Sequence, residues 1–208
     1  MELNAAKISF RETGGKMGDK LAFTIRPQRR PLASPSMFTS NWKKLKEYFV
    51  MATNATTAEE RLAKLGIHLP DAPTPFGAYV PAVQTVSLLF LRGMLATAGH
   101  EVTEVGVVGN ELDVKSGQEA AYRAALNALA LTKKQLGSLD RVSRIVRLGV
   151  YIAATPDFTE HPKVADAASE LFRDVFGDET MSSRLVIGVA SLPLGSPVEL
   201  EVILEVKA

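Results

Sequence analysis

The chain has 208 residues, of which 46% are hydrophobic and 23% are charged, and its formal net charge is +1. This size and balance predict one substantial hydrophobic core, and no apolar run approaches the roughly 18 residues that a membrane span needs. The absence of cysteine excludes disulfides and thiolate nucleophiles, and the three histidines lie too far apart in sequence to support a zinc or iron site, so no metal or cofactor is expected.

The charge is distributed unevenly along the chain. Residues 1–50 hold ten Lys or Arg and four Asp or Glu, a net charge of +6, whereas residues 51–208 hold 14 and 19, a net charge of −5. Between Lys20 and Lys46 there is no acidic residue. The stretch is rich in Pro, Arg and Ser, and its hydrophobic residues follow no helix or strand period. We therefore predict a basic, disordered extension over residues 1–50 and one folded domain over residues 51–208.

Two other interpretations of the extension stay open. Its Arg-rich and Ser-rich composition is typical of an organelle transit segment, although Glu2, Glu12 and Asp19 weaken that interpretation. The segment also fits a non-native extension translated from a start codon upstream of Met51. A cytoplasmic location is the first expectation, and targeting to an organelle through residues 1–50 is the second.

After Met51 the chain alternates regularly between helix and strand signals. Thr57 to Glu60 is a capping-box pattern that begins a short helix, and Gly66 ends it. The elements that follow are expected to be strands over 80–91 and 101–108, a long helix ending at Gly137, a strand over 142–152, a second helix ending at Gly177, and strands over 184–192 and 198–206. This order predicts an α+β fold in which two helices cover one face of a sheet.

Apolar periodicity predicts which side chains of these elements form the core. In the long helix the predicted core residues are Ala121, Ala125, Ala128, Leu129, Thr132 and Leu136. In the second helix they are Val164, Ala167, Ala168, Leu171, Phe172 and Val175. In the strand between the helices they are Val142, Val146, Leu148, Val150 and Ile152.

The last two strands indicate what lies on the other face of the sheet. Along residues 198–206 the valines and leucines point one way, and Glu199, Glu201, Ile203 and Glu205 point the other way. The strand over 185–190 is apolar on both faces, and such strands are usually covered twice. We therefore expect another copy of the chain to cover this face; if it were solvated, Arg184 and the glutamates would be surface charges.

Arg184 stands at the head of this apolar strand. Its planar guanidinium stays charged and suits a carboxylate, so Arg184 is a candidate anion anchor. The alternative is a structural ion pair with a nearby Glu.

Other motifs predict no further chemistry. Gly106 to Gly109 lacks both the dinucleotide-binding glycine order and a Walker lysine, so it predicts a turn with close packing. Lys133 with Lys134 and the arginines over 141–147 are interpreted as a solvated helix end and a strand face. Because the folded part is acidic, a nucleic-acid partner is not favoured.

From about Leu65 to Val206 the chain resembles the RidA family, also called the YjgF family, of reactive intermediate deaminases. The strongest part of the resemblance is Arg184 followed by Leu192-Pro193 and then by Val-Glu-Leu-Glu over 198–201. The other matched positions are Gly77-Ala78-Tyr79, Gly93, Asn127, Pro156-Asp157-Phe158, Val164 and Phe176-Gly177.

The resemblance implies a chorismate-mutase-like fold with a mixed sheet, assembled as a homotrimer with a barrel-like core and three clefts between subunits. It also implies a hydrolase of the 2-iminobutanoate/2-iminopropanoate deaminase type. Such an enzyme converts short-lived enamine and imine carboxylates, such as 2-aminoacrylate, to the 2-oxo acid and ammonia without metal or cofactor. The expected partners are this small carboxylate and two further copies of the chain, with no membrane.

By the same resemblance, three residues carry the catalysis. Arg184 holds the substrate carboxylate, Glu199 orients or activates the attacking water, and Tyr79 lies at the wall of the cleft, contributed across the subunit interface. The protonated imine carbon is already electrophilic, so the protein needs to supply only positioning, a water and proton transfer.

The substrate-binding positions implied by the resemblance are Arg184, Arg92, Gly93 and Val186, and two of them depart from the family pattern. Where many members have Ser-Gly-Gln, this chain has Arg-Gly-Met over 92–94, which adds a second cation. Arg92 either binds a dianionic or larger substrate or blocks the site. Val186 stands where many deaminases have Cys. The alternative function is therefore a non-catalytic trimer that binds a small carboxylate or has a regulatory role.

Overall fold

The computed structural model describes residues 56–75 and 77–207. The described helices are α2 (Ala58–Lys64), α3 (Val114–Leu136) and α4 (His161–Phe176). The described strands are β1 (Ala82–Thr85), β2 (Leu88–Leu91), β3 (Met94–Leu95), β4 (Thr97–Ala98), β5 (Glu101–Val102), β6 (Val142–Ala153), β7 (Ser183–Val189) and β8 (Val198–Val206). The predicted extension over residues 1–50 and its boundary with the folded domain lie outside the described residues.

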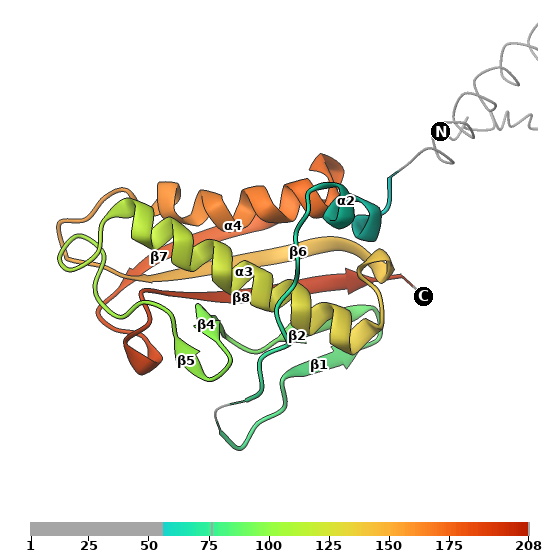
Figure 1. Ribbon diagram of the computed structural model, residues 1–208, viewed down its shortest axis with the longest axis horizontal. Helices are drawn as coiled ribbons and strands as arrows, with labels where there is room; N and C mark the ends of the chain where they lie inside the picture. The colour runs from blue at the N-terminus through green and yellow to red at the C-terminus, as the bar shows by residue number, and fades with distance from the viewer. Residues whose placement is uncertain (1–55, 76, 208) are drawn as a thin grey trace, which may run out of the picture. The chain divides into compact units, whose positions relative to one another are not determined.

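The main sheet is mixed and runs in the order β1-β2-β8-β6-β7, with β3 also paired to β8. β6 and β7 are parallel, whereas the other neighbours are antiparallel. α3 and α4 lie side by side across one face of this sheet, and α2 packs against α4 (Figure 1). The predicted α+β arrangement with two helices on one face is confirmed.

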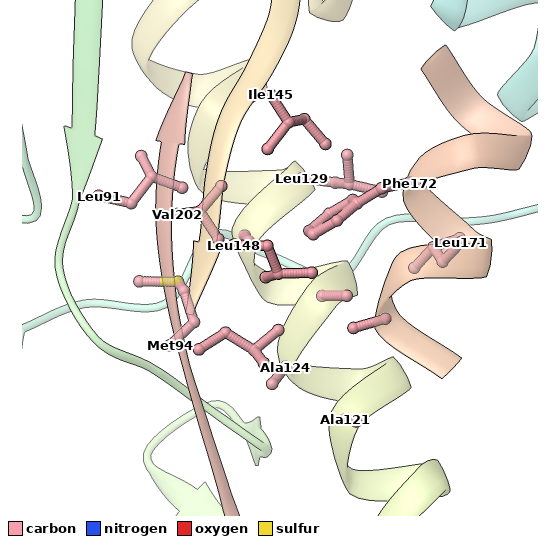
Figure 2. Close-up of a cluster of buried hydrophobic side chains, with 14 of the residues drawn as sticks. Leu91, Met94, Ala121, Ala124, Leu129, Ile145, Leu148, Leu171, Phe172 and Val202 are labelled. Atoms are coloured by element: carbon pink, nitrogen blue, oxygen red, sulfur yellow. The ribbon is translucent and has the colours of Figure 1, made fainter. Parts of the chain in front are cut away.

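The hydrophobic core lies between the two long helices and the sheet (Figure 2). All six predicted core residues of α3 are buried, and so are those of α4 except Ala167, which is only partly buried. Alanines dominate the inner face of α3, so the helix can lie close to β8 and α4. Each larger aliphatic side chain buried here contributes about 1.5–3 kcal/mol. The core residues labelled in the figure are Leu91, Met94, Ala121, Ala124, Leu129, Ile145, Leu148, Leu171, Phe172 and Val202.

The strand predicted over 80–91 is wrong, because this run is a hairpin. β1 and β2 pair with each other around a turn at Val86 and Ser87. Val86 has φ +52°, in the left-handed region that β-branched residues rarely adopt. A valine in the turn hid the turn from the sequence pattern, since glycine and asparagine are the residues that usually mark it.

The strand predicted over 101–108 is also wrong. β5 contains only Glu101 and Val102 and pairs with β4 in a separate two-stranded sheet. The rest of the run is a loop whose Gly106 and Gly109 both have positive φ, and between them Val108 is fully buried. The predicted turn with close packing at Gly106 to Gly109 is therefore confirmed.

β6 contains the predicted strand over 142–152, but its inner face is offset in one place. The register with β8 shifts between Val142 and Arg144 and again between Ile145 and Arg147. As a result Ile145 is buried and Val146 is exposed, the reverse of the predicted alternation. A bulge adds a residue to one strand, so the period-2 pattern fails across it.

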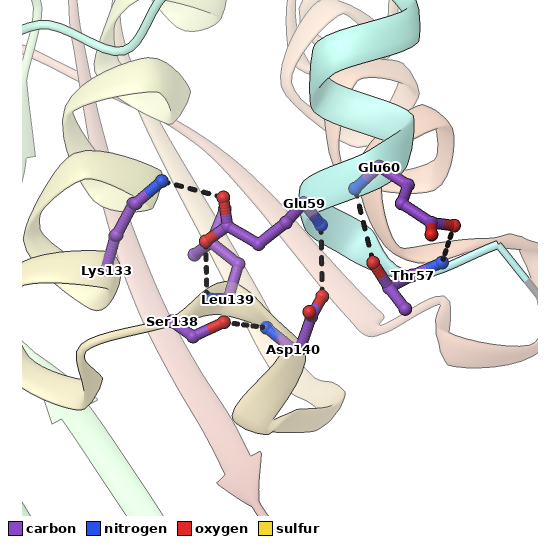
Figure 3. A network of polar contacts seen from close by, with 7 residues as sticks. All are labelled: Thr57, Glu59, Glu60, Lys133, Ser138, Leu139 and Asp140. Atoms are coloured by element: carbon purple, nitrogen blue, oxygen red, sulfur yellow. Dashed lines mark hydrogen bonds and ion pairs between the residues drawn. The ribbon is translucent and has the colours of Figure 1, made fainter.

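Glu59 joins α2 to the junction between α3 and β6 (Figure 3). Its carboxylate accepts hydrogen bonds from Lys133 Nζ at 2.7 Å and from the backbone N–H of Leu139 at 3.0 Å. Its own backbone N–H donates to Asp140 Oδ1 at 3.0 Å. The predicted solvated helix end is present, since Lys134 is exposed and the Lys133 side chain is 44% exposed, but Lys133 also forms this ion pair with Glu59.

The capping box predicted at the start of α2 is present. Thr57 Oγ1 accepts from the backbone N–H of Glu60, and the Glu60 carboxylate accepts from the backbone N–H of Thr57, both at 3.2 Å. Within residues 56–75 and 77–207, no helix has both the length and the apolar character that crossing a bilayer requires.

Candidate active site

The site begins with an irregularity where the chain passes from β2 to β3. Both strands pair with β8, with Phe90 opposite Ile203 and Met94 opposite Leu200. Between Phe90 and Met94 there are three residues, 91–93, but between their partners on β8 there are only two, 201–202. The extra residue is a β-bulge, a feature that redirects side chains at the edge of a site.

Gly93 in this bulge lies against the side chain of Glu199. A Cβ atom at Gly93 would collide with the Glu199 carboxylate and would lie 2.8 Å from its Cδ. Only glycine leaves room for the carboxylate in this position. The bulge and the start of β8 therefore fit together through a glycine and a glutamate, which were both predicted site residues.

A cavity of about 470 Å³ opens beside this contact. Four segments form its walls: the loop before β1, the bulge, the Pro193–Gly195 turn and the start of β8. The lining residues are Gly77, Tyr79, Arg92, Gly93, Leu95, Pro193, Leu194 and Glu199. The predicted site residues Tyr79, Arg92, Gly93 and Glu199 are thus brought together within one chain.

Arg92 is held by the loop before β1. Its Nη1 donates to the Tyr79 hydroxyl and its Nη2 donates to the backbone carbonyl of Thr74, both at 3.2 Å. The guanidinium carbon also lies 5.9 Å from the centre of the Tyr79 ring, within the range of a cation–π interaction. These contacts fix the orientation of the guanidinium at the cavity wall.

Glu199 is half-buried, and this burial raises the pKa of its carboxyl above the ordinary value of 4.5, with a smaller opposing effect from the positive charge of Arg92. Removing water from a carboxylate disfavours its charged form. The same side chain also lines a second depression of about 350 Å³ beside Tyr151 and Glu201. Glu199 therefore stands at the junction of two hollows with a perturbed acidity, as acid–base residues commonly do.

Arg184 lies elsewhere in the chain's own fold. Its Nη1 donates to Asp166 Oδ1 at 2.7 Å and to the Ser169 hydroxyl at 3.0 Å, both on α4. These three residues line a separate cavity of about 380 Å³. The ion pair that the sequence left open is therefore present, but its partner is an aspartate of α4 and not a glutamate. Asp166 and Ser169, three residues apart on α4, were not predicted as partners.

The sheet register explains why Arg184 and Glu199 do not meet. Arg184 is paired with Leu148, and Leu148 is paired with Val202, both buried under the helices. Glu199 is three residues from Val202, so its side chain points to the opposite face of the sheet. Within one chain, Arg184 and the glutamates of β8 therefore lie on opposite faces of the sheet. Val186 follows Arg184 by two residues and likewise packs against the core side.

The face of the sheet opposite the helices carries both apolar and charged side chains. Leu185 and Ile187 of β7 are 41% and 40% exposed, which is high for aliphatic side chains in a sheet. On β8, Glu201 pairs with Arg147 at 3.1 Å. The predicted alternation of β8, with its valines and leucines buried under the helices and its glutamates on the other face, is confirmed.

A cavity of about 680 Å³ lies between α3 and the loop at Thr103 and Glu104, but it contains none of the predicted site residues. Among residues 56–75 and 77–207, no three His, Asp or Glu side chains gather as metal ligands would. The cavity at Glu199 is the better candidate for an active site, because it combines a half-buried acid of raised pKa with an oriented cation.

Comparison with known proteins places these features in a family context. Residues 59–206 match the family model described as "YjgF/chorismate_mutase-like, putative endoribonuclease". The curated protein TCP17 of Trypanosoma cruzi is 39% identical over 145 residues, covering 69% of this chain and 91% of its own length. A 2-iminobutanoate/2-iminopropanoate deaminase of Dermatophagoides farinae is 28% identical over 141 residues, covering 68% of this chain and 95% of its own length. A solved structure, the Agrobacterium tumefaciens protein Atu1372 of unknown function, is 36% identical with a TM-score of 0.66, and the match covers 72% of this chain and 92% of that one.

Proposed function

Because the chain belongs to the YjgF/RidA family, with its chorismate-mutase-like α+β fold, we propose that it hydrolyses the C=N bond of short-lived imino acids at the Glu199 cavity. The observation that carries this proposal is a half-buried carboxyl of raised pKa beside an oriented guanidinium. The name of the Dermatophagoides farinae relative, a 2-iminobutanoate/2-iminopropanoate deaminase, supports the same reaction.

The chemistry asks little of the protein. Water adds to the carbon of the protonated imine, the new C–O bond forms, and the C=N π electrons move to nitrogen. The resulting carbinolamine then breaks its C–N bond while its hydroxyl oxygen forms the C=O bond and releases its proton, so that a protonated imino acid and one water yield a 2-oxo acid, ammonia and a proton. Glu199 takes a proton from the attacking water and returns it to the leaving nitrogen. A glutamate whose pKa is raised by burial is better suited to both transfers than an exposed one.

Tyr79 and Gly93 shape the place where the substrate lies. Gly93 allows the carboxylate of Glu199 to reach the cavity, and Tyr79 forms one wall and orients Arg92. A nucleophilic side chain is not required, because the imine carbon is the electrophile and water is the nucleophile.

Arg184 enters this proposal as the carboxylate anchor contributed by a neighbouring subunit. Within one chain it lies on the face of the sheet opposite to Glu199, so the two can share a substrate only if two copies of the chain meet. The exposed Leu185 and Ile187 next to Arg184 support such a contact between copies. We propose a homotrimer, in which each cleft combines Arg184 of one subunit with the Glu199 cavity of the next, acting in the cytoplasm.

The test is the hydrolysis of 2-aminoacrylate, generated in place by a serine dehydratase and followed by pyruvate release over the uncatalysed rate. We expect the full chain to accelerate the reaction and Glu199→Gln to lose about 100-fold or more of the acceleration, as for loss of an acid–base group. Arg184→Ala should raise KM. Glu205→Gln is the matched control, because Glu205 lies on the same strand and face but outside the cavity.

Unaltered acceleration by Glu199→Gln would remove Glu199 from the mechanism. If the full chain gives no acceleration but binds 2-oxobutanoate, the protein is the non-catalytic carboxylate-binding member of the fold that the sequence left as its alternative. Light scattering on the same sample measures whether the assembly is a trimer.

A further inference from the structure

Arg92 is the feature of the cavity that imine hydrolysis by itself does not require. It lies in the bulge between β2 and β3, so its direction is set by the backbone irregularity and not by the strand alternation. Hydrogen bonds to the Tyr79 hydroxyl and the Thr74 carbonyl then hold the guanidinium at the wall that Glu199 also lines. An arginine fixed before binding loses little side-chain entropy when an anion arrives.

The surroundings of Arg92 favour an anionic ligand. Of the described residues that line the cavity, two are charged, Arg92 and Glu199, and Leu95, Pro193 and Leu194 are apolar. An apolar wall lowers the local dielectric and strengthens a charge-assisted pair.

Two arginines therefore serve two different places in the assembled site. Arg184 belongs to the helix-covered face of β7, whereas Arg92 belongs to the bulge beside Glu199 on the opposite side of the sheet. In the trimeric cleft proposed above, Arg184 binds the carboxylate next to the imine carbon. An anionic group bound at Arg92 would therefore be a second group of the substrate.

On the basis of the proposed function, we infer that Arg92 binds a second carboxylate on the substrate, so that the substrates are 2-imino dicarboxylic acids. A single guanidinium matches the single charge of a carboxylate, whereas a phosphate group carries nearly two charges at neutral pH. The reaction that supplies such a substrate is the oxidation of an acidic amino acid at its Cα–N bond. The product here is a 2-oxo dicarboxylic acid with ammonia.

The first experiment compares two imines of different charge. Flavin-dependent amino-acid oxidases, with catalase, generate 2-iminoglutarate from glutamate and 2-iminobutanoate from 2-aminobutanoate, and release of the 2-oxo acid is timed above the uncatalysed rate. We expect kcat/KM of the full chain to be about tenfold or more higher for 2-iminoglutarate, the effect of one charge-assisted pair. In Arg92→Ser this ratio should fall to about one, and Arg92→Lys should retain part of it.

The second experiment measures binding without turnover. Calorimetric Kd values for the stable products 2-oxoglutarate and 2-oxobutanoate should favour 2-oxoglutarate in the full chain and lose that preference in Arg92→Ser. Arg123→Ser is the matched control, because Arg123 is exposed on α3 and lines the other cavity. It should leave both ratios as they are.

The two hypotheses fail differently. If neither imine is hydrolysed faster than in buffer, the proposed function fails. If both imines are hydrolysed with equal kcat/KM, or if Arg92→Ser keeps the preference for the dicarboxylate, the assignment of Arg92 is overturned and the deaminase proposal stands.

Discussion

The carboxylate of Glu199 rests on the α-carbon of Gly93, so closely that a Cβ at position 93 would overlap it. This contact joins the bulge after β2 to the beginning of β8, and it fixes where the Glu199 carboxylate lies in the cavity wall. Glu199 can therefore take this position only because the neighbouring residue, Gly93, has no side chain.

Gly93→Ala should move Glu199 and destabilise the fold. Forcing a methyl group into an occupied site costs about 1–3 kcal/mol, and we expect a loss of that size in the free energy of unfolding by urea denaturation. The control is a double-mutant cycle with Glu199→Ala, in which the colliding atoms are gone and Gly93→Ala should cost much less. Equal costs in both backgrounds would show that the collision with Glu199 is not the cause.

Glu199→Gln should change the dependence of stability on pH. Because the folded-state pKa of Glu199 is raised above 4.5 by burial, its stabilising contribution is greatest below pH 4.5 and decreases as the pH rises through the folded-state value. The glutamine variant does not titrate, so it should gain stability relative to the unaltered chain over that window and hold the gain at higher pH. Urea unfolding from pH 4 to pH 8 measures this difference, and a difference that is constant with pH would contradict the burial effect.

Asp166→Asn should release Arg184 for a substrate carboxylate. The aspartate now accepts the hydrogen bond from Arg184 Nη1 at 2.7 Å, and Asp166 is half exposed, so the pair is screened by solvent. Removing the competing charge should lower KM for an imino acid by about threefold to tenfold. Asp174→Asn, on the same helix and away from Arg184, is the control. A raised KM in Asp166→Asn would mean that Asp166 positions Arg184 for the substrate and does not compete with it.

Asn127→Asp, which replaces only the side-chain NH2 group by an oxygen, should strongly destabilise the folded state. The buried Asn127 amide nitrogen donates to the carbonyl oxygens of Leu95 and Thr97 at 3.0 Å and to the Thr97 hydroxyl at 3.2 Å. An aspartate would turn an anion towards acceptors, at a cost of about 3 kcal/mol or more. The control is Gln118→Glu: Gln118 lies on α3 like Asn127, its exposed amide donates to the carbonyl of Lys163 on α4, and the change should cost below about 1 kcal/mol. Similar losses of thermal stability in the two variants would rule out the buried network as the reason.

Local patterns predicted much of this fold because they depend on neighbours in sequence. The capping box at Thr57 and the ends of the helices at Gly137 and Gly177 follow from backbone chemistry within one or two turns. The inner face of β8 follows from strict alternation over nine residues without a bulge. The same reasoning failed at two places. At Val86 the chain turns without a glycine, and near Ile145 a bulge adds a residue to β6 relative to β8.

The candidate site was predictable as residue types but not as an arrangement. The sequence alone identified Tyr79, Gly93 and Glu199 through a resemblance spread over the chain, and it identified Arg92 as a departure from the family pattern. That Arg92 faces Glu199 while Arg184 faces Asp166 was decided only by tertiary structure. The physical reason is register: these contacts depend on how β8 aligns with the bulge after β2 and on how α4 lies over β7, and both alignments join segments that no local period relates.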